Sequence, residues 1–332
     1  MNSAIHPKEV TNMPTQIPAH RRRRRRGPLL FPAACLLFLL LGVLLGRRSM
    51  AAAAPAVKPS APAGAPAVST PADSTPIPDG WQPEDGDIHS GTLVLVGSAY
   101  PYVFPEDQPL VNVLEAKNDC YFVRDGTVQL APETMDALNR MMADFTAQGG
   151  PKRVNVVAGY RTEEFQQHLF DQSAAANGLE HARRYVAQPG GSEHHTGYAV
   201  DFSLYYPDSG ASGTFDGTGD YRWIAEHAPD YGFVLRYPAD KEALTGIGAE
   251  SWHYRYVGLP HAPLMTKLGL CLEEYIDFLR QYPREGEHLY TEWDGQAYEV
   301  YFCQAETLYV PDGDSYTLSG NNVDGFIVTI PF

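Results

Sequence analysis

The pattern of apolar and polar residues differs between three successive parts of the 332-residue chain. Residues 28–46 are apolar and carry no charge, and as a helix they would measure about 28 Å, enough to span a bilayer core. Residues 51–78 are mainly Ala, Pro, Ser and Thr, which favours an extended linker because this composition cannot bury a core. Short apolar segments separated by Gly, Pro and charged residues begin near Trp81, where we expect the folded region to start.

The N-terminal part predicts a membrane-anchored protein. Residues 1–27 form a basic tail that contains six consecutive arginines, Arg21 to Arg26. Positive charge before a spanning helix places the N-terminus in the cytoplasm. We therefore expect a cytoplasmic tail (1–27), a single-pass anchor in the cell membrane (28–46) and a linker (47–80) that carries an extracytoplasmic domain. Cleavage of the apolar segment as a signal peptide, followed by secretion, is the alternative.

Periodic apolar positions predict the elements of the folded region. The predicted helices cover residues 132–148, 163–175, 178–187, 220–231 and 265–282. The predicted strands cover residues 92–96, 120–123, 153–160, 198–204, 233–237, 251–257, 298–303 and 326–330. Helices and strands follow one another without regular alternation, which favours an α+β fold over a doubly wound sheet. The tail from Leu289 onward has the pattern of β-hairpins.

Charge and cysteine content narrow the possible partners. Residues 51–332 carry 16 Lys and Arg against 39 Asp and Glu, a net charge of −23. Such an acidic region argues against nucleic acid or an anionic lipid surface as its partner. Three cysteines lie beyond the apolar run, too few for a disulfide-dense scaffold. A bridge between Cys271 and Cys303 is an option that the sequence leaves open.

Histidines and carboxylates gather in two segments, SEHHTGYAVD (192–201) and ESWH (250–253). We predict that His194, Asp201 and His253 hold one zinc ion. Three protein ligands leave the fourth tetrahedral position for water, which is typical of a catalytic zinc site. Asp201 has apolar neighbours, and a metal ion is a partner that compensates a buried carboxylate. We do not assign His195 as a ligand, because adjacent side chains diverge.

Glu250 lies three residues before His253 and is the predicted general base of a metal-assisted hydrolysis. On a regular strand, residues three apart face opposite sides. We therefore expect a turn or bulge near Ser251 that brings Glu250 and His253 into one cleft.

Together with AGYRTEEFQ (158–166), these segments resemble the three signatures of the VanY-type D-alanyl-D-alanine carboxypeptidases, zinc peptidases of the M15 (LAS) family. The motifs stand in the family's order, and the resemblance covers about residues 110–282. It implies a small central antiparallel sheet flanked by helices. This sheet would belong to a zinc carboxypeptidase domain at 81–284, followed by a C-terminal β-hairpin appendage at 285–332.

The resemblance also implies roles for particular residues and a substrate. Arg161 would act in catalysis and, with Gln166 and Ser192, bind the substrate; its planar guanidinium suits a C-terminal carboxylate. The implied reaction removes the terminal D-Ala from the pentapeptide of a peptidoglycan stem. An L,D-carboxypeptidase acting on the tetrapeptide is one alternative. A non-catalytic zinc-containing cell-wall binding module is the other, and the presence of Glu250 argues against it.

Overall fold

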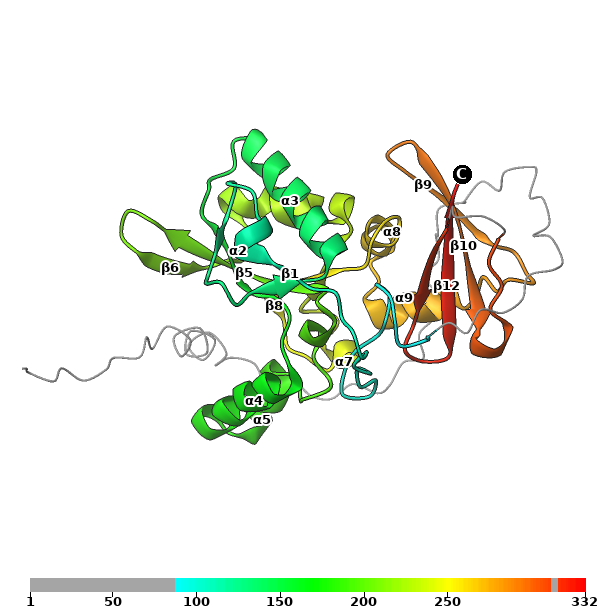
Figure 1. Ribbon diagram of the computed structural model, residues 1–332, viewed down its shortest axis with the longest axis horizontal. Helices are drawn as coiled ribbons and strands as arrows, with labels where there is room; N and C mark the ends of the chain where they lie inside the picture. The colour runs from blue at the N-terminus through cyan, green and yellow to red at the C-terminus, as the bar shows by residue number, and fades with distance from the viewer. Residues whose placement is uncertain (1–86, 312–315) are drawn as a thin grey trace, which may run out of the picture. The chain divides into compact units, whose positions relative to one another are not determined.

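The computed structural model describes residues 87–311 and 316–332 (Figure 1). The predicted tail (1–27), anchor (28–46) and linker (47–80) lie outside the described residues. Within the described ranges, no helix combines the length and the apolar character that crossing a membrane requires. Helices and strands are mixed along the chain, as the α+β class expected from the sequence requires.

A six-stranded sheet forms the centre of the fold and carries Asp201, Glu250 and His253. Its strands are β2 (Phe122–Val123), β4 (Val154–Ala158), β5 (Ala199–Tyr206), β6 (Ala211–Thr214), β7 (Phe233–Tyr237) and β8 (Glu250–Tyr256). Their order is β2-β4-β5-β8-β7, and β6 pairs with the C-terminal half of β5. All pairs are antiparallel except β2 with β4. The expected antiparallel sheet is therefore present, with one parallel pair at its edge.

The helix α3 (Pro132–Ala147) covers one face of this sheet (Figure 1). Pro132 stands in the first turn, where the missing N–H would have had no partner in the helix. The apolar residues of α3 recur at helical spacing and enter the same buried cluster as β4 and β5. They are Met135, Ala137, Leu138, Met141, Met142 and Phe145.

Shorter helices surround this core. Thr162 caps α4 (Glu163–Asn177), because its hydroxyl accepts a hydrogen bond from the backbone N–H of Phe165 at 3.2 Å. The others are α2 (Val113–Ala116), α5 (Leu179–Tyr185), α6 (Arg222–His227), α7 (Glu242–Thr245), α8 (His261–Leu268) and α9 (Leu272–Leu279). A two-stranded sheet of β1 (Val111–Asn112) and β3 (Gln129–Leu130) completes this part.

The C-terminal residues form a second, four-stranded antiparallel sheet. Its strands are β9 (Leu289–Trp293), β10 (Gln296–Gln304), β11 (Thr317–Gly320) and β12 (Gly325–Pro331). A two-residue loop joins β9 to β10, and both Asp294 and Gly295 have positive φ, which suits the right-handed twist of a hairpin. One face of this sheet shares a buried cluster with α8 and α9. One apolar cluster therefore contains residues from both sides of the domain boundary expected between residues 284 and 285.

Several expectations about local structure are wrong. The segment 92–96 forms no strand, although Leu93 to Val96 are buried. The Leu93 N–H bonds to the Ser319 hydroxyl and the Leu95 N–H to the Asn321 carbonyl. The helix predicted at 265–282 is broken at Gly269, whose φ of 66° ends α8 before α9 begins. The helix predicted at 220–231 is a short α6 flanked by two 3-10 turns.

The disulfide option is also excluded. Cys271 and Cys303, like Cys120, are free thiols. Cys271 is the N-cap of α9 and Cys303 lies on β10, and both side chains are buried. Each therefore contributes to packing as a small apolar side chain.

His261 provides a test of how the C-terminal sheet is joined to the helices. Its ring, on α8, lies 2.9 Å from the Tyr275 hydroxyl on α9 and 3.0 Å from the Thr329 hydroxyl on β12. Burial lowers the pKa of His261 from 6.5 to about 3. The unfolded chain takes up this proton below pH 6.5 whereas the folded protein does not, so folding stability is full above pH 6.5 and falls as the pH decreases.

We expect His261 to remove about 2 kcal/mol of unfolding free energy between pH 7 and pH 5, at about 1.4 kcal/mol per pH unit below 6.5. Denaturant unfolding at both pH values, compared with a His261→Gln variant, measures this difference. The variant is expected to be less stable at pH 7 and to lose less stability on acidification. Equal pH dependence in the two proteins would contradict the assignment.

Candidate metal centre

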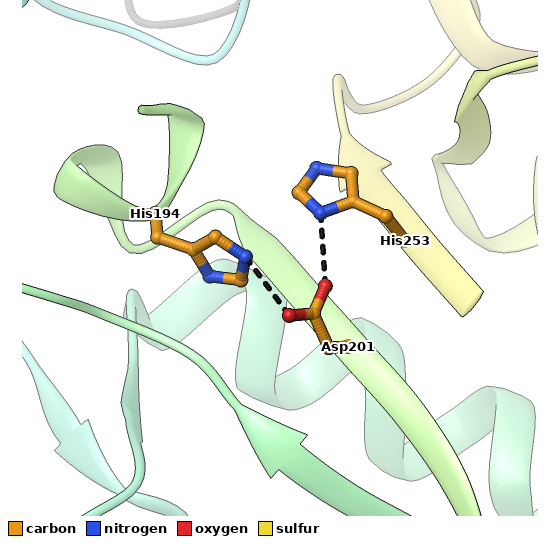
Figure 2. A group of neighbouring side chains, drawn as sticks. All are labelled: His194, Asp201 and His253. Atoms are coloured by element: carbon orange, nitrogen blue, oxygen red, sulfur yellow. Dashed lines mark hydrogen bonds and ion pairs between the residues drawn. The ribbon is translucent and has the colours of Figure 1, made fainter. Parts of the chain in front are cut away.

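His194, Asp201 and His253 lie together, as the sequence predicted (Figure 2). One potential ligand atom from each residue lies within 4.8 Å of the others, and all three side chains are buried. His194 comes from the 3-10 turn η2 (Glu193–Thr196), Asp201 from β5 and His253 from β8. Three elements thus supply the three candidate ligands.

The register of the sheet sets the distance between two of the three residues. In the antiparallel pair β5–β8, Asp201 stands directly opposite His253, so their side chains share one face. Asp201 Oδ1 lies 2.9 Å from His253 Nδ1, and Asp201 Oδ2 lies 3.2 Å from His194 Nε2. The two oxygens of one carboxylate therefore face the two imidazole rings.

A tight turn places His194 against this pair. Gly197 ends η2 with a φ of 76°, and a Cβ there would lie 3.0 Å from the Ala131 backbone nitrogen. His194 Nδ1 lies 2.6 Å from the Gly159 carbonyl, which can only accept, so Nδ1 carries the proton. Burial, assisted by the charge of Arg161, lowers the pKa of His194 to about 4. The neutral ring therefore presents the lone pair of Nε2 to the cluster.

His253 has carboxylates on both sides of its ring. Nδ1 faces Asp201, and Nε2 lies 3.4 Å from Glu193 Oε2. Burial acts to lower the pKa of His253, but the hydrogen bonds to Asp201 and Glu193 outweigh it and raise this pKa to about 9. Nδ1 of His253 thus faces another candidate ligand, Asp201.

The donor set fits zinc. Two imidazole nitrogens and one carboxylate oxygen form a common set of protein ligands in catalytic zinc sites. A metal-binding histidine usually donates its other N–H to a carbonyl or carboxylate, and Gly159 and Glu193 offer these acceptors here.

Glu250 joins the cluster through an irregularity in β8. Along β7 the chain advances from Leu235 to Tyr237 while the paired residue on β8 moves from Tyr254 to Glu250, which is the register shift expected near Ser251. Glu250 Oε2 consequently lies 3.9 Å from His253 Nδ1. Burial raises the pKa of Glu250 to about 7, although the positive charge of His253 opposes this rise. A carboxyl group with this pKa can exchange a proton near neutral pH.

The other predicted site residues lie at the edge of the cluster. Arg161 Nη2 lies 2.8 Å from Asp201 Oδ2. The Arg161 side chain is 18 % exposed, so it contacts both the buried carboxylate and solvent. Arg161 Nη1 donates to Gln166 Oε1 at 3.3 Å, and the buried Gln166 donates to the Ala187 carbonyl at 2.8 Å. Ser192 is buried and directly precedes η2, the turn that carries His194.

His195, which was not assigned as a ligand, uses its ring nitrogens elsewhere. Its Nδ1 lies 2.7 Å from the Arg161 carbonyl, and its Nε2 accepts from the Gly190 N–H at 3.2 Å. The two ring nitrogens of His195 therefore connect the loop at Gly190 with the turn that contains Arg161.

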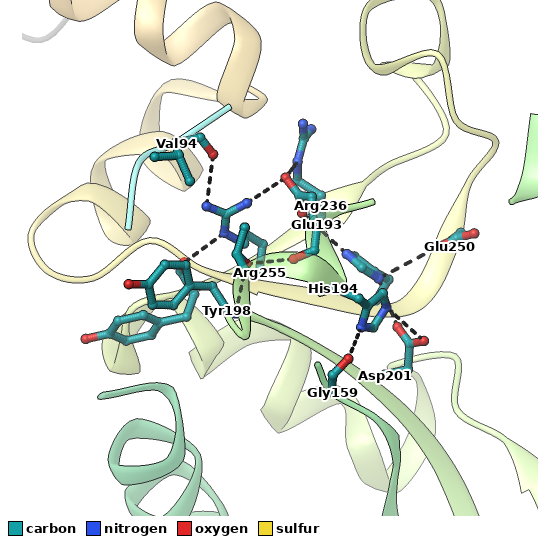
Figure 3. A network of polar contacts seen from close by, with 12 residues as sticks. Val94, Gly159, Glu193, His194, Tyr198, Asp201, Arg236, Glu250 and Arg255 are labelled. Atoms are coloured by element: carbon teal, nitrogen blue, oxygen red, sulfur yellow. Dashed lines mark hydrogen bonds and ion pairs between the residues drawn. The ribbon is translucent and has the colours of Figure 1, made fainter. Parts of the chain in front are cut away.

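The sequence argument missed a group of buried charges behind His253 (Figure 3). Glu193 Oε1 lies 2.7 Å from Arg236 Nε and 2.9 Å from Arg255 Nη1, and all three side chains are at most 1 % exposed. The sequence did contain a signal, since each arginine stands in a strand made mostly of apolar and aromatic residues, FVLRY or SWHYRYV. A charge in such a position needs a buried partner.

This geometry is that of a metal-dependent hydrolase, with three candidate ligands and an adjacent buried carboxyl group. The family described as VanY, D-alanyl-D-alanine carboxypeptidase, matches residues 127–259. A D-alanyl-D-alanine carboxypeptidase of Enterococcus faecium is 34% identical over 251 residues, which cover 73% of this chain and 76% of the relative. The chain therefore belongs to the VanY family of D-Ala-D-Ala peptidases, and it is by family a zinc metallocarboxypeptidase.

Two further comparisons agree with this assignment. The bifunctional D-Ala-D-Ala dipeptidase and carboxypeptidase VanXYC of Enterococcus gallinarum is 39% identical, over 58% of this chain and 98% of the relative. The crystal structure of the vancomycin resistance D,D-dipeptidase VanXYg, in complex with a D-Ala-D-Ala phosphinate analog, matches with a TM-score of 0.65. It is 34% identical, and the match covers 74% of this chain and 95% of that one.

Proposed function

We propose that this chain is an extracytoplasmic zinc-dependent D,D-carboxypeptidase that removes the terminal D-Ala from peptidoglycan stem pentapeptides. His194, Asp201 and His253 would hold one zinc ion. The observation that carries the proposal is the buried Glu250 carboxyl beside these three residues, in a chain of the VanY family. Bound zinc supplies Lewis-acid chemistry, because it polarises a carbonyl group and lowers the pKa of a water molecule.

Glu250 is the proton carrier of the proposed reaction. Its pKa of about 7 suits it to accept a proton from the attacking water and to return it to the leaving amine. Burial produces this pKa, and the irregular β8 places the carboxyl on the same side as His253. No other element has to move to bring Glu250 to the cluster.

Arg161 is the proposed recognition group for the substrate's terminal carboxylate. Its guanidinium is partly exposed and already binds one carboxylate, that of Asp201. A planar guanidinium can bind a carboxylate through two parallel hydrogen bonds, so the same group can orient the C-terminal residue of a peptide. The hydrogen bond to Gln166, itself fixed to the Ala187 carbonyl, keeps Arg161 at the edge of the site.

We expect Glu250→Gln to lower kcat by about a hundredfold or more, because the amide cannot carry the proton. The variant should retain one zinc ion per chain, since Glu250 is not a ligand in the proposal. Asp201→Asn is the contrasting variant and should lose zinc and activity together. Metal content by mass spectrometry and single-substrate kinetics measure both effects. Near-normal turnover of Glu250→Gln would remove its proposed role.

Substrate choice is tested with synthetic stem peptides. We expect loss of one alanine from the pentapeptide, no change in the tetrapeptide, and no reaction in the presence of a chelator. Mass spectrometry of the products distinguishes these cases. Cleavage of the tetrapeptide would instead identify an L,D-carboxypeptidase. Cleavage of neither peptide by zinc-loaded protein would favour a binding module.

We also propose that residues 28–46 anchor the protein in the cell membrane, with the catalytic domain outside. The support is the charge-free apolar run after six arginines. We expect the full-length protein to stay with membranes during alkaline washing and its domain to be digested by protease added to spheroplasts. An N-terminally shortened protein recovered from the medium would instead favour a cleaved signal peptide.

A further inference from the structure

Behind the candidate metal centre lies a buried network of four charged residues: Glu193, Arg236, Arg255 and Glu273. They come from η2, β7, β8 and α9, and only Glu273 has appreciable exposure, 20 % of its side chain. Two positive and two negative charges balance within the group. Removing ions from water costs free energy even when they are paired. A stabilising effect alone is therefore a weak explanation for this network.

The two oxygens of Glu193 have different partners. Oε1 faces both arginines, 2.7 Å from Arg236 Nε and 2.9 Å from Arg255 Nη1. Oε2 instead faces His253 Nε2 at 3.4 Å. Because the arginines occupy one oxygen, the other is left to the imidazole on the side away from Asp201.

Both arginines are themselves held in place. Arg236 donates two hydrogen bonds to Glu273, of 2.9 and 2.7 Å, from the guanidinium nitrogens that do not face Glu193. Arg255 Nη2 donates to the carbonyls of Thr92 and Val94 at 2.9 and 3.0 Å. Glu193 thus has little freedom to turn away from His253.

We propose that Glu193 is a positioning residue that keeps the proton of His253 on Nε2 and the lone pair of Nδ1 directed at the metal. This inference rests on the proposed zinc function. A carboxylate that accepts from the outer N–H of a ligand histidine fixes its tautomer and ring orientation and strengthens it as a donor. Arg236 and Arg255 hold Glu193 in the orientation that this task requires, and Glu273 completes the charge balance.

The test is the zinc affinity of Glu193→Gln, measured by competition with a chromophoric chelator. The variant keeps the length of the side chain but removes its charge, and we expect the zinc dissociation constant to rise about 10- to 100-fold. The matched control is Glu273→Gln, which removes the far end of the network without touching His253. Its zinc dissociation constant should stay within about threefold of the wild-type value, even where its melting temperature falls.

A merely structural role for the network would lower the melting temperature in both variants and leave zinc affinity unchanged in both, which would overturn the proposal. An equal loss of affinity in both variants would overturn it as well, because the effect would not depend on the contact with His253. Failure of the wild-type protein to bind zinc would instead refute the proposed function.

A second measurement does not depend on the Glu193→Gln variant and applies even where that variant does not fold. Nitrogen-15 NMR of the zinc-loaded wild-type protein, with labelled histidine, reports which ring nitrogen carries a proton. We expect His253, assigned by its loss in a His253→Gln variant, to be protonated at Nε2 and metal-bound at Nδ1. The opposite arrangement would overturn the proposal.

Discussion

The pairing of Asp201 with His253 across β5 and β8 is the interaction on which the site depends. A single buried carboxylate faces both imidazole rings and the guanidinium of Arg161. Burial alone would raise the pKa of Asp201, but the charges and hydrogen bonds of His194 and His253 outweigh it and hold this pKa well below its usual range. Each of them comes from a different element, so the turn η2 and the two strands must be correctly placed before the carboxylate is compensated. The candidate ligands therefore come together only when the domain has folded.

The support for this arrangement comes from distant parts of the chain. Arg255 reaches back to the carbonyls of Thr92 and Val94, and Arg236 reaches forward to Glu273 on α9. The helix α9 in turn packs against the C-terminal sheet in a common apolar cluster. Segments without any family motif therefore hold β7 and β8 in place, and β8 carries His253. This gives the C-terminal sheet a physical connection to the site through packed side chains and buried ion pairs.

Local sequence signals predicted the parts of this structure that depend on local physics. The spacing of His194, Asp201 and His253 indicated a metal centre, and the odd spacing of Glu250 required the irregularity found in β8. The network around Glu193 was missed because it is made by residues from four elements whose relative placement no local pattern encodes. The same reason explains the segment 92–96. Its apolar side chains are buried as those of a strand would be, but its backbone N–H groups bond to the Ser319 hydroxyl on β11 and to the Asn321 carbonyl.

The acidity of the chain makes Arg161 more consequential. A substrate that ends in a carboxylate approaches a region of net charge −23 and needs a local positive group. Arg161 offers one, but in this structure it is paired with Asp201 Oδ2, the same oxygen that faces His194. A cation held by Asp201 would compete with the guanidinium for this carboxylate and would supply its compensating charge. Under the proposed function, we therefore expect metal binding to loosen Arg161 from Asp201 and make it available to the substrate, so that one carboxylate coordinates assembly of the metal centre with recognition of the peptide.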